Sequence, residues 1–338
     1  MPSWGPLSIA GQRVAPGEVR SIRIQVSESY TTMPVHMPIT IMRGTHPGPT
    51  VSITAAIHGD ELIGMEVVRR FIAEMEGREL HGTVVCVPVV NVLGFHRQQR
   101  NMPDGRDLNR SFPGNAHGSP TSRLAHLFFT EVITACQYGI DFHTGGTGRV
   151  NIPHIRSNLE SNAVVGVARA FGSRLVLRSK GEQGMLRNAA AKQGIHIVTY
   201  EAGEPLRFDS LIARAAMRGV FNVLGTLGVV EWERQAPEHQ FVAERSAWIR
   251  AERGGIVIPN VVPGQLVRRG EEIARNTNPL GKQVNVLHAQ RDGLIVSLRT
   301  LPMVNPGDPV VQLVRVDESE WELAEKAFPQ LETGPVVI

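Results

Sequence analysis

The apolar positions of the chain fall into two regions with different periodicities. In the first, continuous apolar runs at 51–57 and 83–90 predict buried strands, because of their length and their β-branched residues. Between them, residues 62–73 are apolar at helical spacing. A strand, a helix and a strand in this order form a βαβ unit, which favours a mostly parallel sheet with covered faces.

Further elements of the same kind extend from residue 20 to residue 227. Alternating apolar and polar positions within 20–44 predict two strands joined around 27–32. More strands are expected at 139–146, 174–177 and 195–203, and more helices at 121–136, 161–171, 184–193 and 210–227. The sequence therefore predicts an α/β fold, with a mostly parallel mixed sheet and flanking helices.

The second region, from 251 to 316, has short apolar pairs separated by Gly and Pro at close intervals, which is typical of an all-β module. We therefore expect an α/β domain at 1–230, which would be the catalytic domain, and a small C-terminal β-domain at 251–316. Residues 231–250 are interpreted as a connection, and 317–338 as a terminal helix and tail.

Composition and charge exclude several classes of protein. The chain has 338 residues, a net charge of +3 and no Lys/Arg tract, so a nucleic-acid partner is not expected. No window approaches the ~18 apolar residues of a membrane span, and the N-terminus has no signal-peptide pattern. The two cysteines, Cys86 and Cys136, lie in apolar contexts and are expected to be buried thiols. We expect a cytoplasmic protein without a membrane partner.

Four chemically active side chains stand at the C-terminal ends of predicted strands: His58, Glu61, His143 and Glu201. In a parallel sheet these ends meet at one edge, where ligands bind. Two imidazoles and one carboxylate form a catalytic zinc site with an open position, and zinc lowers the pKa of bound water to about 7. A further carboxylate can take the proton of that water and deliver it to a leaving nitrogen. The sequence predicts zinc ligands at His58, Glu61 and His143, and a general base at Glu201.

The region 91–120 has no periodicity and is rich in Gly, Pro, Asn and Arg, so we interpret it as a binding loop. Arg100 or Arg106 could supply a fixed positive charge to a developing oxyanion. Asn109 and Arg110 suit a substrate carboxylate, which a guanidinium binds through two parallel hydrogen bonds. Solvent-exposed loop charge is the competing interpretation for these arginines, and we prefer it for Arg106.

Four motifs in order resemble the succinylglutamate desuccinylase/aspartoacylase family of zinc carboxypeptidase-like hydrolases. They are His58-Gly59-Asp60-Glu61, Asp107-Leu108-Asn109-Arg110 with Phe112-Pro113-Gly114, Asp141-Phe142-His143-Thr144-Gly145, and Glu201-Ala202-Gly203. The resemblance covers about residues 35–230. It implies a hydrolase that uses one Zn²⁺ per chain to remove the acyl group from a small N-acyl amino acid, of acetyl or succinyl type.

The resemblance also implies roles for single residues. His58, Glu61 and His143 would bind zinc, Glu201 would be the general base, and Asn109 and Arg110 would bind the substrate carboxylate. Of the loop arginines, Arg100 is the one we assign to the substrate carbonyl. Asp141, two residues before a predicted ligand, is a candidate to orient an imidazole.

Three other functions remain as alternatives. They are a carboxypeptidase acting on small peptides, a non-catalytic protein with the same fold, and a nucleic-acid-binding or acyl-carrier protein. The carrier interpretation rests on Lys282, because the turns of the C-terminal module resemble a biotinyl/lipoyl-type barrel-sandwich. We expect instead a structural β-domain that shapes the mouth of the active site or contributes to a homo-oligomer contact.

Overall fold

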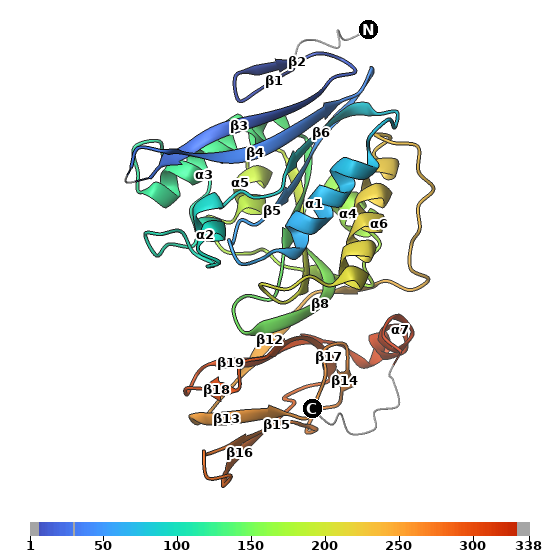
Figure 1. Ribbon diagram of the computed structural model, residues 1–338. Helices are drawn as coiled ribbons and strands as arrows, with labels where there is room; N and C mark the ends of the chain where they lie inside the picture. The colour runs from blue at the N-terminus through green and yellow to red at the C-terminus, as the bar shows by residue number, and fades with distance from the viewer. Residues whose placement is uncertain (1–6, 30, 330–338) are drawn as a thin grey trace.

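The computed structural model describes residues 7–29 and 31–329, and its N-terminal two thirds are built around one large sheet (Figure 1). The strands of this part are β1 (Leu7–Ile9), β2 (Gln12–Val14), β3 (Val19–Glu28), β4 (Pro34–Arg43), β5 (His46–Ala55), β6 (His81–Val87), β7 (Tyr138–His143), β8 (Arg149–Ser157), β9 (Leu175–Arg178), β10 (His196–Gly203) and β11 (Phe241–Ala243). Across the sheet, β3, β4, β6, β5, β7, β10 and β8 are neighbours in that order, whereas β1 and β2 pair only with each other.

Helices cover both faces of this sheet. They are α1 (Ile63–Glu74), α2 (Val92–His96), α3 (Pro120–Glu131), α4 (Asn162–Ala170), α5 (Leu186–Ala191) and α6 (Ser210–Thr226). Figure 1 shows α1, α4 and α6 on one side of the sheet, and α2, α3 and α5 on the other. Successive side chains of a strand point to opposite faces of the sheet. Val84 and Cys86 of β6 therefore pack with α1 and α6, whereas Val85 and Val87 pack with α3 on the other face.

The helix starts follow from local sequence. The Ser119 hydroxyl accepts a hydrogen bond from the Ser122 amide, and Pro120 occupies the first position of α3. The Asp209 carboxylate accepts hydrogen bonds from the amides of Leu211 and Ile212 at the start of α6. These caps satisfy amides that have no partner within the helix.

The sheet is mixed, and the expectation of a mostly parallel sheet is correct for its centre and for the pairings of β9 with β8 and β11. Strands β6, β5, β7 and β10 are parallel neighbours. β4 and β8 run antiparallel to this group on its two sides, and β3 pairs antiparallel with β4. The physical reason is the length of the connections. β3 and β4 are joined by a short turn, which permits only antiparallel pairing.

The expected binding loop contains two short helical turns, α2 and the 3₁₀ turn η1 (Leu108–Arg110). A second 3₁₀ turn, η2 (Ile133–Ala135), follows α3, so the helix expected to reach residue 136 ends earlier. Strand β8 was not expected from the sequence. The segment interpreted as a connection includes β11, which pairs in parallel with β9.

The C-terminal part of the described chain contains strands from residue 246 to residue 315. They are β12 (Ser246–Arg250), β13 (Gly255–Pro259), β14 (Leu266–Val267), β15 (Glu272–Thr277), β16 (Gln283–His288), β17 (Gly293–Arg299), β18 (Met303–Val304) and β19 (Pro309–Arg315). β16, β15, β13 and β18 form a separate sheet, whereas β12, β19 and β17 extend the large sheet. A core that includes Ile249, Val257 and Ile273 lies between the two sheets. The likeness to a biotinyl/lipoyl-type sandwich and the domain limits stay predictions.

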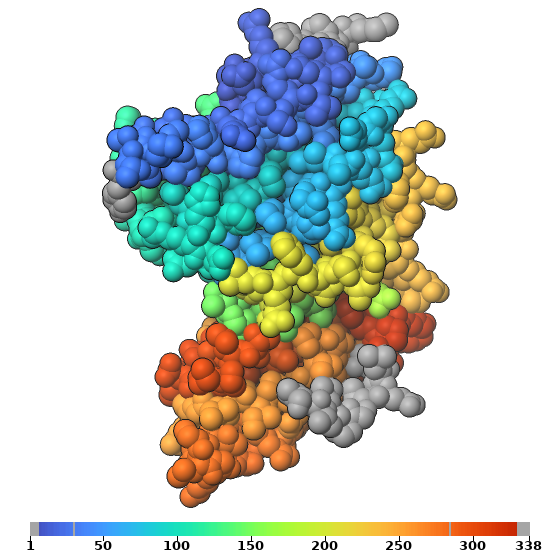
Figure 2. Space-filling view, in the orientation of Figure 1, coloured from blue at the N-terminus to red at the C-terminus, as the bar shows by residue number. Residues whose placement is uncertain are grey.

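The two parts of the chain are joined through β8. Ser297, Leu298 and Arg299 of β17 pair antiparallel with the first three residues of β8. Figure 2 shows the C-terminal strands, coloured orange to red, as a lobe below the N-terminal part. The chain continues into η3 (Glu318–Glu320) and α7 (Trp321–Ala327), close to the expected terminal helix. Among the described residues, no helix has the length and apolar character required to cross a bilayer.

Candidate active site

The turn after β5 brings His58 and Glu61 to the edge of the sheet. Ala56, the residue after the strand, adopts a left-handed backbone conformation with φ of 52°. A Cβ atom on Gly59 would lie 2.1 Å from the carbonyl carbon of Gly94, so the turn requires glycine at this position. The close approach of α2 therefore explains the glycine between the histidine and the acids of this motif.

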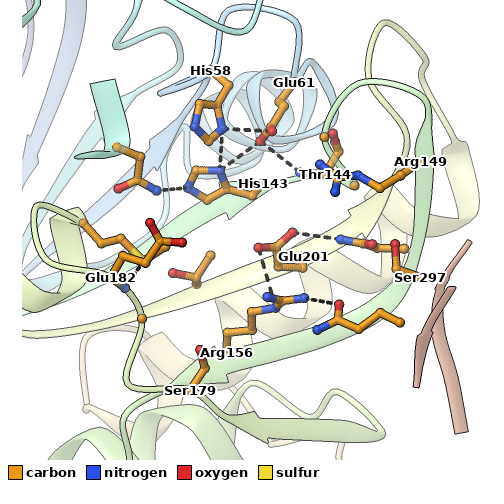
Figure 3. Close-up of a pocket in the computed structure, with 18 of the residues that line it drawn as sticks. His58, Glu61, His143, Thr144, Arg149, Arg156, Ser179, Glu182, Glu201 and Ser297 are labelled. Atoms are coloured by element: carbon orange, nitrogen blue, oxygen red, sulfur yellow. Dashed lines mark hydrogen bonds and ion pairs between the residues drawn. The ribbon is translucent and has the colours of Figure 1, made fainter. Parts of the chain in front are cut away.

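The side chains of His58, Glu61 and His143 converge on one point (Figure 3). The Nδ1 atoms of the two histidines are 3.1 Å apart. The Glu61 carboxylate reaches both of them, at 2.9 Å from His58 Nδ1 and 2.9 Å from His143 Nδ1. All three residues are buried, with at most 3% of their surface exposed.

Each histidine has a carboxylate on its other ring nitrogen. Nε2 of His58 lies 3.1 Å from Asp107 Oδ1, and Nε2 of His143 lies 2.8 Å from Asp141 Oδ2. This is the arrangement by which proteins fix the orientation and raise the basicity of a metal-binding imidazole. Asp141 therefore makes the contact expected of it, and Asp107 provides its counterpart on the other histidine.

The electrostatics of this cluster favour a cation. Burial alone would raise the pKa of Glu61, but the adjacent imidazoles of His58 and His143 outweigh it and hold that pKa well below its usual range. Burial alone would lower the pKa of His143, but Asp141 and Glu61 outweigh it and raise that pKa well above its usual value. A buried site that attracts a proton in this way, with two imidazoles and a carboxylate as donors, fits Zn²⁺.

Glu201 lies two residues before the end of β10, beside this cluster, and its carboxylate is held from both sides. Nδ2 of Asn151 donates a hydrogen bond of 2.9 Å to Oε2, and Nε of Arg156 lies 3.8 Å from Oε1. Burial alone would raise the pKa of Glu201, but Arg156 and His143 outweigh it and lower that pKa. The carboxylate is therefore ionised at neutral pH and able to accept a proton.

Arg156 is in turn held by the C-terminal strands. Its Nη2 donates a hydrogen bond of 2.8 Å to Oε1 of Gln312 in β19, and its Nε donates to Nε2 of His154 at 3.0 Å. The side-chain amide of Gln312 donates to the Ser246 hydroxyl at 3.0 Å. A chain of contacts thus runs from the C-terminal strands to the carboxylate of Glu201, and Figure 3 shows its last two steps.

The structure separates the two candidate loop arginines. Arg100 lines the cavity, where its Nη1 donates to Glu61 Oε1 at 3.0 Å and its Nη2 donates to Asp107 Oδ2 at 3.0 Å. Arg106 is exposed and donates to the Ser119 hydroxyl. Arg106 is therefore surface loop charge, as preferred from the sequence, and Arg100 is the arginine next to the histidine cluster.

Asn109 and Arg110 also line the cavity and are already partly engaged. Oδ1 of Asn109 accepts a hydrogen bond of 2.9 Å from the Leu186 amide. Arg110 binds Glu182 through two parallel contacts, Nε to Oε2 at 2.7 Å and Nη2 to Oε1 at 3.2 Å. Arg110 thus already holds a carboxylate in the geometry expected for a substrate.

A single cavity of about 470 Å³ is lined by the seven residues to which the sequence assigned metal binding, substrate binding or catalysis: His58, Glu61, Arg100, Asn109, Arg110, His143 and Glu201. Its lining carries five arginines against three carboxylates, so it suits a small anionic molecule. The arginines are Arg100, Arg110, Arg149, Arg156 and Arg187. Trp248, Ser297 and Gln312 from the C-terminal strands complete the wall, and the Arg149 guanidinium stacks on the Trp248 ring at 5.3 Å.

Sequence reasoning missed several residues of this site. Arg149, Asn151 and Arg187 were candidates for substrate contact from the sequence, without a motif to support them, and all three line the cavity. Arg156 and Gln312 carried no signal, because their importance depends on contacts between residues 156 positions apart. Asp107 belongs to one of the four motifs, but its position three residues before Arg110 gave no indication that it contacts His58.

Comparison with known proteins agrees with this arrangement. The family model described as the succinylglutamate desuccinylase/aspartoacylase catalytic domain matches residues 47–227, more than half of the chain. The chain belongs to this family. The match covers β5 to α6 and hence all seven candidate site residues, and the family comprises enzymes that deacylate N-acyl amino acids. The resemblance noted from the four sequence motifs is confirmed.

Individual relatives extend the similarity beyond the matched domain. The N-alpha-acetyl-L-2,4-diaminobutyric acid deacetylase of Halomonas elongata is 28% identical over 299 residues, which cover 84% of this chain and 87% of the relative. The product-bound ectoine utilization protein of Ruegeria pomeroyi superposes with a TM-score of 0.82 at 24% identity, over 92% of this chain and 99% of that one. A succinylglutamate desuccinylase/aspartoacylase from Rhodobacter sphaeroides superposes with a TM-score of 0.79 at 25% identity, over 88% of this chain and 96% of that one.

Proposed function

We propose that this protein is a zinc-dependent deacylase that hydrolyses the amide bond of a small N-acyl amino acid. One observation carries the proposal. The buried donors of His58, Glu61 and His143 converge beside an ionised Glu201 in an arginine-lined cavity. Membership of a family of N-acyl amino acid deacylases supports the same reaction class.

In this proposal His58, Glu61 and His143 hold one Zn²⁺ per chain. When bound, the ion supplies a Lewis acid that polarises a carbonyl and makes water easier to deprotonate. Asp107 and Asp141 keep the two imidazoles oriented, so that both Nδ1 atoms face the same point.

Glu201 is the general base. Its carboxylate accepts the proton of the attacking water and later delivers it to the nitrogen of the departing amino acid. Asn151 and Arg156 limit its rotation, so the accepting oxygen is oriented before substrate arrives. Arg100, next to Glu61, donates to the oxygen of the substrate carbonyl as negative charge develops on it.

Asn109 and Arg110 bind the carboxylate of the substrate. The bidentate pair of Arg110 with Glu182 supports this role, because the guanidinium already accommodates a carboxylate there. Substrate binding then requires that the exposed Glu182 side chain release Arg110. The volume and the charge of the cavity favour a free amino acid derivative over a longer peptide.

The acyl group is proposed to be of acetyl or succinyl type. The relative from Halomonas elongata is named for the deacetylation of N-alpha-acetyl-L-2,4-diaminobutyric acid, so acetylated amino acids are the first compounds to test. A cytoplasmic location and a homo-oligomeric state stay predictions.

The test is amine release by the zinc-loaded protein from a panel of N-acetyl and N-succinyl amino acids, with a dipeptide panel beside it. Release from one class of acyl amino acid is the expected result. Release only from dipeptides would favour a carboxypeptidase, and no release from either panel would contradict the proposal.

A further inference from the structure

We propose that the protein binds a second divalent metal ion at an exposed site formed by His46, Glu79 and His81. These three side chains offer one carboxylate and two imidazole donors, whose ligand atoms all lie within 4.8 Å of one another. The site is separate from the buried cluster described above. Two imidazoles and a carboxylate suit borderline cations such as Zn²⁺, Ni²⁺ and Cu²⁺.

The backbone pre-organises the two histidines. His46 and His81 are direct partners across the parallel strands β5 and β6, at the start of each strand. Their rings lie 4.7 Å apart, with planes inclined by 36°. The His81 amide donates a hydrogen bond of 2.8 Å to the Val229 carbonyl, which anchors the start of β6. Little chain ordering is therefore required when an ion binds between the rings.

The two distances from the Glu79 carboxylate match those between donors of a tetrahedral zinc site. Oε1 of Glu79 lies 3.5 Å from Nδ1 of His46 and 3.4 Å from Nε2 of His81. Zinc bonds of about 2.0–2.2 Å at the tetrahedral angle place neighbouring donors about 3.3–3.5 Å apart. An ion can therefore occupy the space between these atoms with only small side-chain movements.

The hydroxyl of Thr45 makes a competing contact in this cluster, at 3.0 Å from Nδ1 of His46. A hydroxyl rotates freely and all three donor residues are exposed, so water can replace this contact at a small cost in free energy. Exposure also leaves a fourth coordination position open to water. We therefore expect weaker binding here than at the buried cluster, which is shielded and backed by two carboxylates.

The second site is remote from the reaction. β5 runs from His46 to Ala55 and leads directly to His58, so its length of about 30 Å separates the two clusters. Occupation of the exposed site should leave amide hydrolysis unchanged. It should, however, add a second equivalent to any metal content measured in excess zinc.

The experiment is a calorimetric titration of the full-length protein with zinc chloride at pH 7.5, after dialysis that leaves only the tightly bound equivalent. We expect the parent to bind one further equivalent. His81→Ala and His46→Ala should abolish this event, and His117→Ala, which alters an exposed histidine elsewhere, should retain it. His143→Ala should lose the tight equivalent and keep the weak one, which separates this proposal from the proposed function.

Two results would overturn the second site. One is the absence of a further equivalent in the parent. The other is a further equivalent that survives both His81→Ala and His46→Ala. Thermal unfolding of each variant at the parent's midpoint would establish that the exposed substitutions leave the fold intact.

Discussion

Replacing Gln312 with alanine tests whether the C-terminal strands contribute to catalysis through Arg156. Gln312 is 4% exposed and accepts a hydrogen bond of 2.8 Å from the Arg156 guanidinium. Its removal leaves Nη2 of Arg156 without this partner and frees the guanidinium to leave Glu201. The substitution touches none of the proposed metal donors.

The magnitude follows from the nature of this bond. A hydrogen bond to a charged group contributes about 1.5–3 kcal/mol. If that energy is expressed in the transition state, kcat falls about 10- to 150-fold, since 1.36 kcal/mol corresponds to a factor of ten. The reduction should be mainly in kcat, because the orientation of the base matters during proton transfer and not in substrate binding.

The assay is steady-state amine release by zinc-loaded Gln312→Ala beside the parent, with zinc content and thermal midpoint measured on the same samples. Ser246→Ala is the matched control, because it removes only the far end of the contact chain, and its kcat should stay within about threefold of the parent. A folded, zinc-loaded Gln312→Ala enzyme with the parent's kcat would refute the role of Arg156 in orienting Glu201.

Three further predictions test other parts of the account. Arg110→Ala should raise KM by about tenfold or more with a smaller effect on kcat, and the parent should show a similar loss on amide-capped substrate; equal KM values for capped and free substrates would contradict carboxylate binding by Arg110. Burial lowers the pKa of His154 from 6.5 to about 4, so the unfolded chain takes up this proton first, and the free energy of unfolding should fall on acidification. Between pH 7 and pH 4.5, the free energy of unfolding measured with urea should fall by on the order of 2–3 kcal/mol more in the parent than in His154→Gln. Equal decreases in the two proteins would contradict the lowered pKa of His154. Burial raises the pKa of the Cys136 thiol to about 12 and raises that of Cys86 as well, so neither should react with a thiol-specific disulfide reagent at pH 8 until urea is added; rapid reaction of the native protein would contradict their burial.

The sequence predicts the centre of the fold and of the site because both have local signatures. β5, α1 and β6 come from apolar runs whose period changes from strand to helix and back. His58, Glu61, His143 and Glu201 lie at or near the carboxyl ends of the strands, and the parallel register of β5, β7 and β10 brings those ends together. The two cysteines are buried, as their apolar contexts indicated.

The parts that sequence reasoning missed lack such signatures. β8 combines Asn151 and Arg156, which point into the cavity, with Pro153 in its middle, so its hydrophobic alternation is broken by the residues of the site. The mixed character of the sheet depends on pairing partners, which hydrophobic periodicity does not specify. The bond from Gln312 to Arg156 joins two parts of the chain and becomes visible only in three dimensions.

The most direct test of the account compares Glu201→Gln with the parent for zinc content and amine release on the same preparations, after dialysis that leaves only tightly bound metal. Glu231→Gln, which alters an exposed carboxylate outside the cavity, is the control and should retain turnover. The account predicts about one zinc per chain in all three proteins and a loss of at least ~100-fold in turnover for Glu201→Gln alone. Turnover close to the parent's in a zinc-loaded Glu201→Gln enzyme would contradict the assignment of Glu201 as the base.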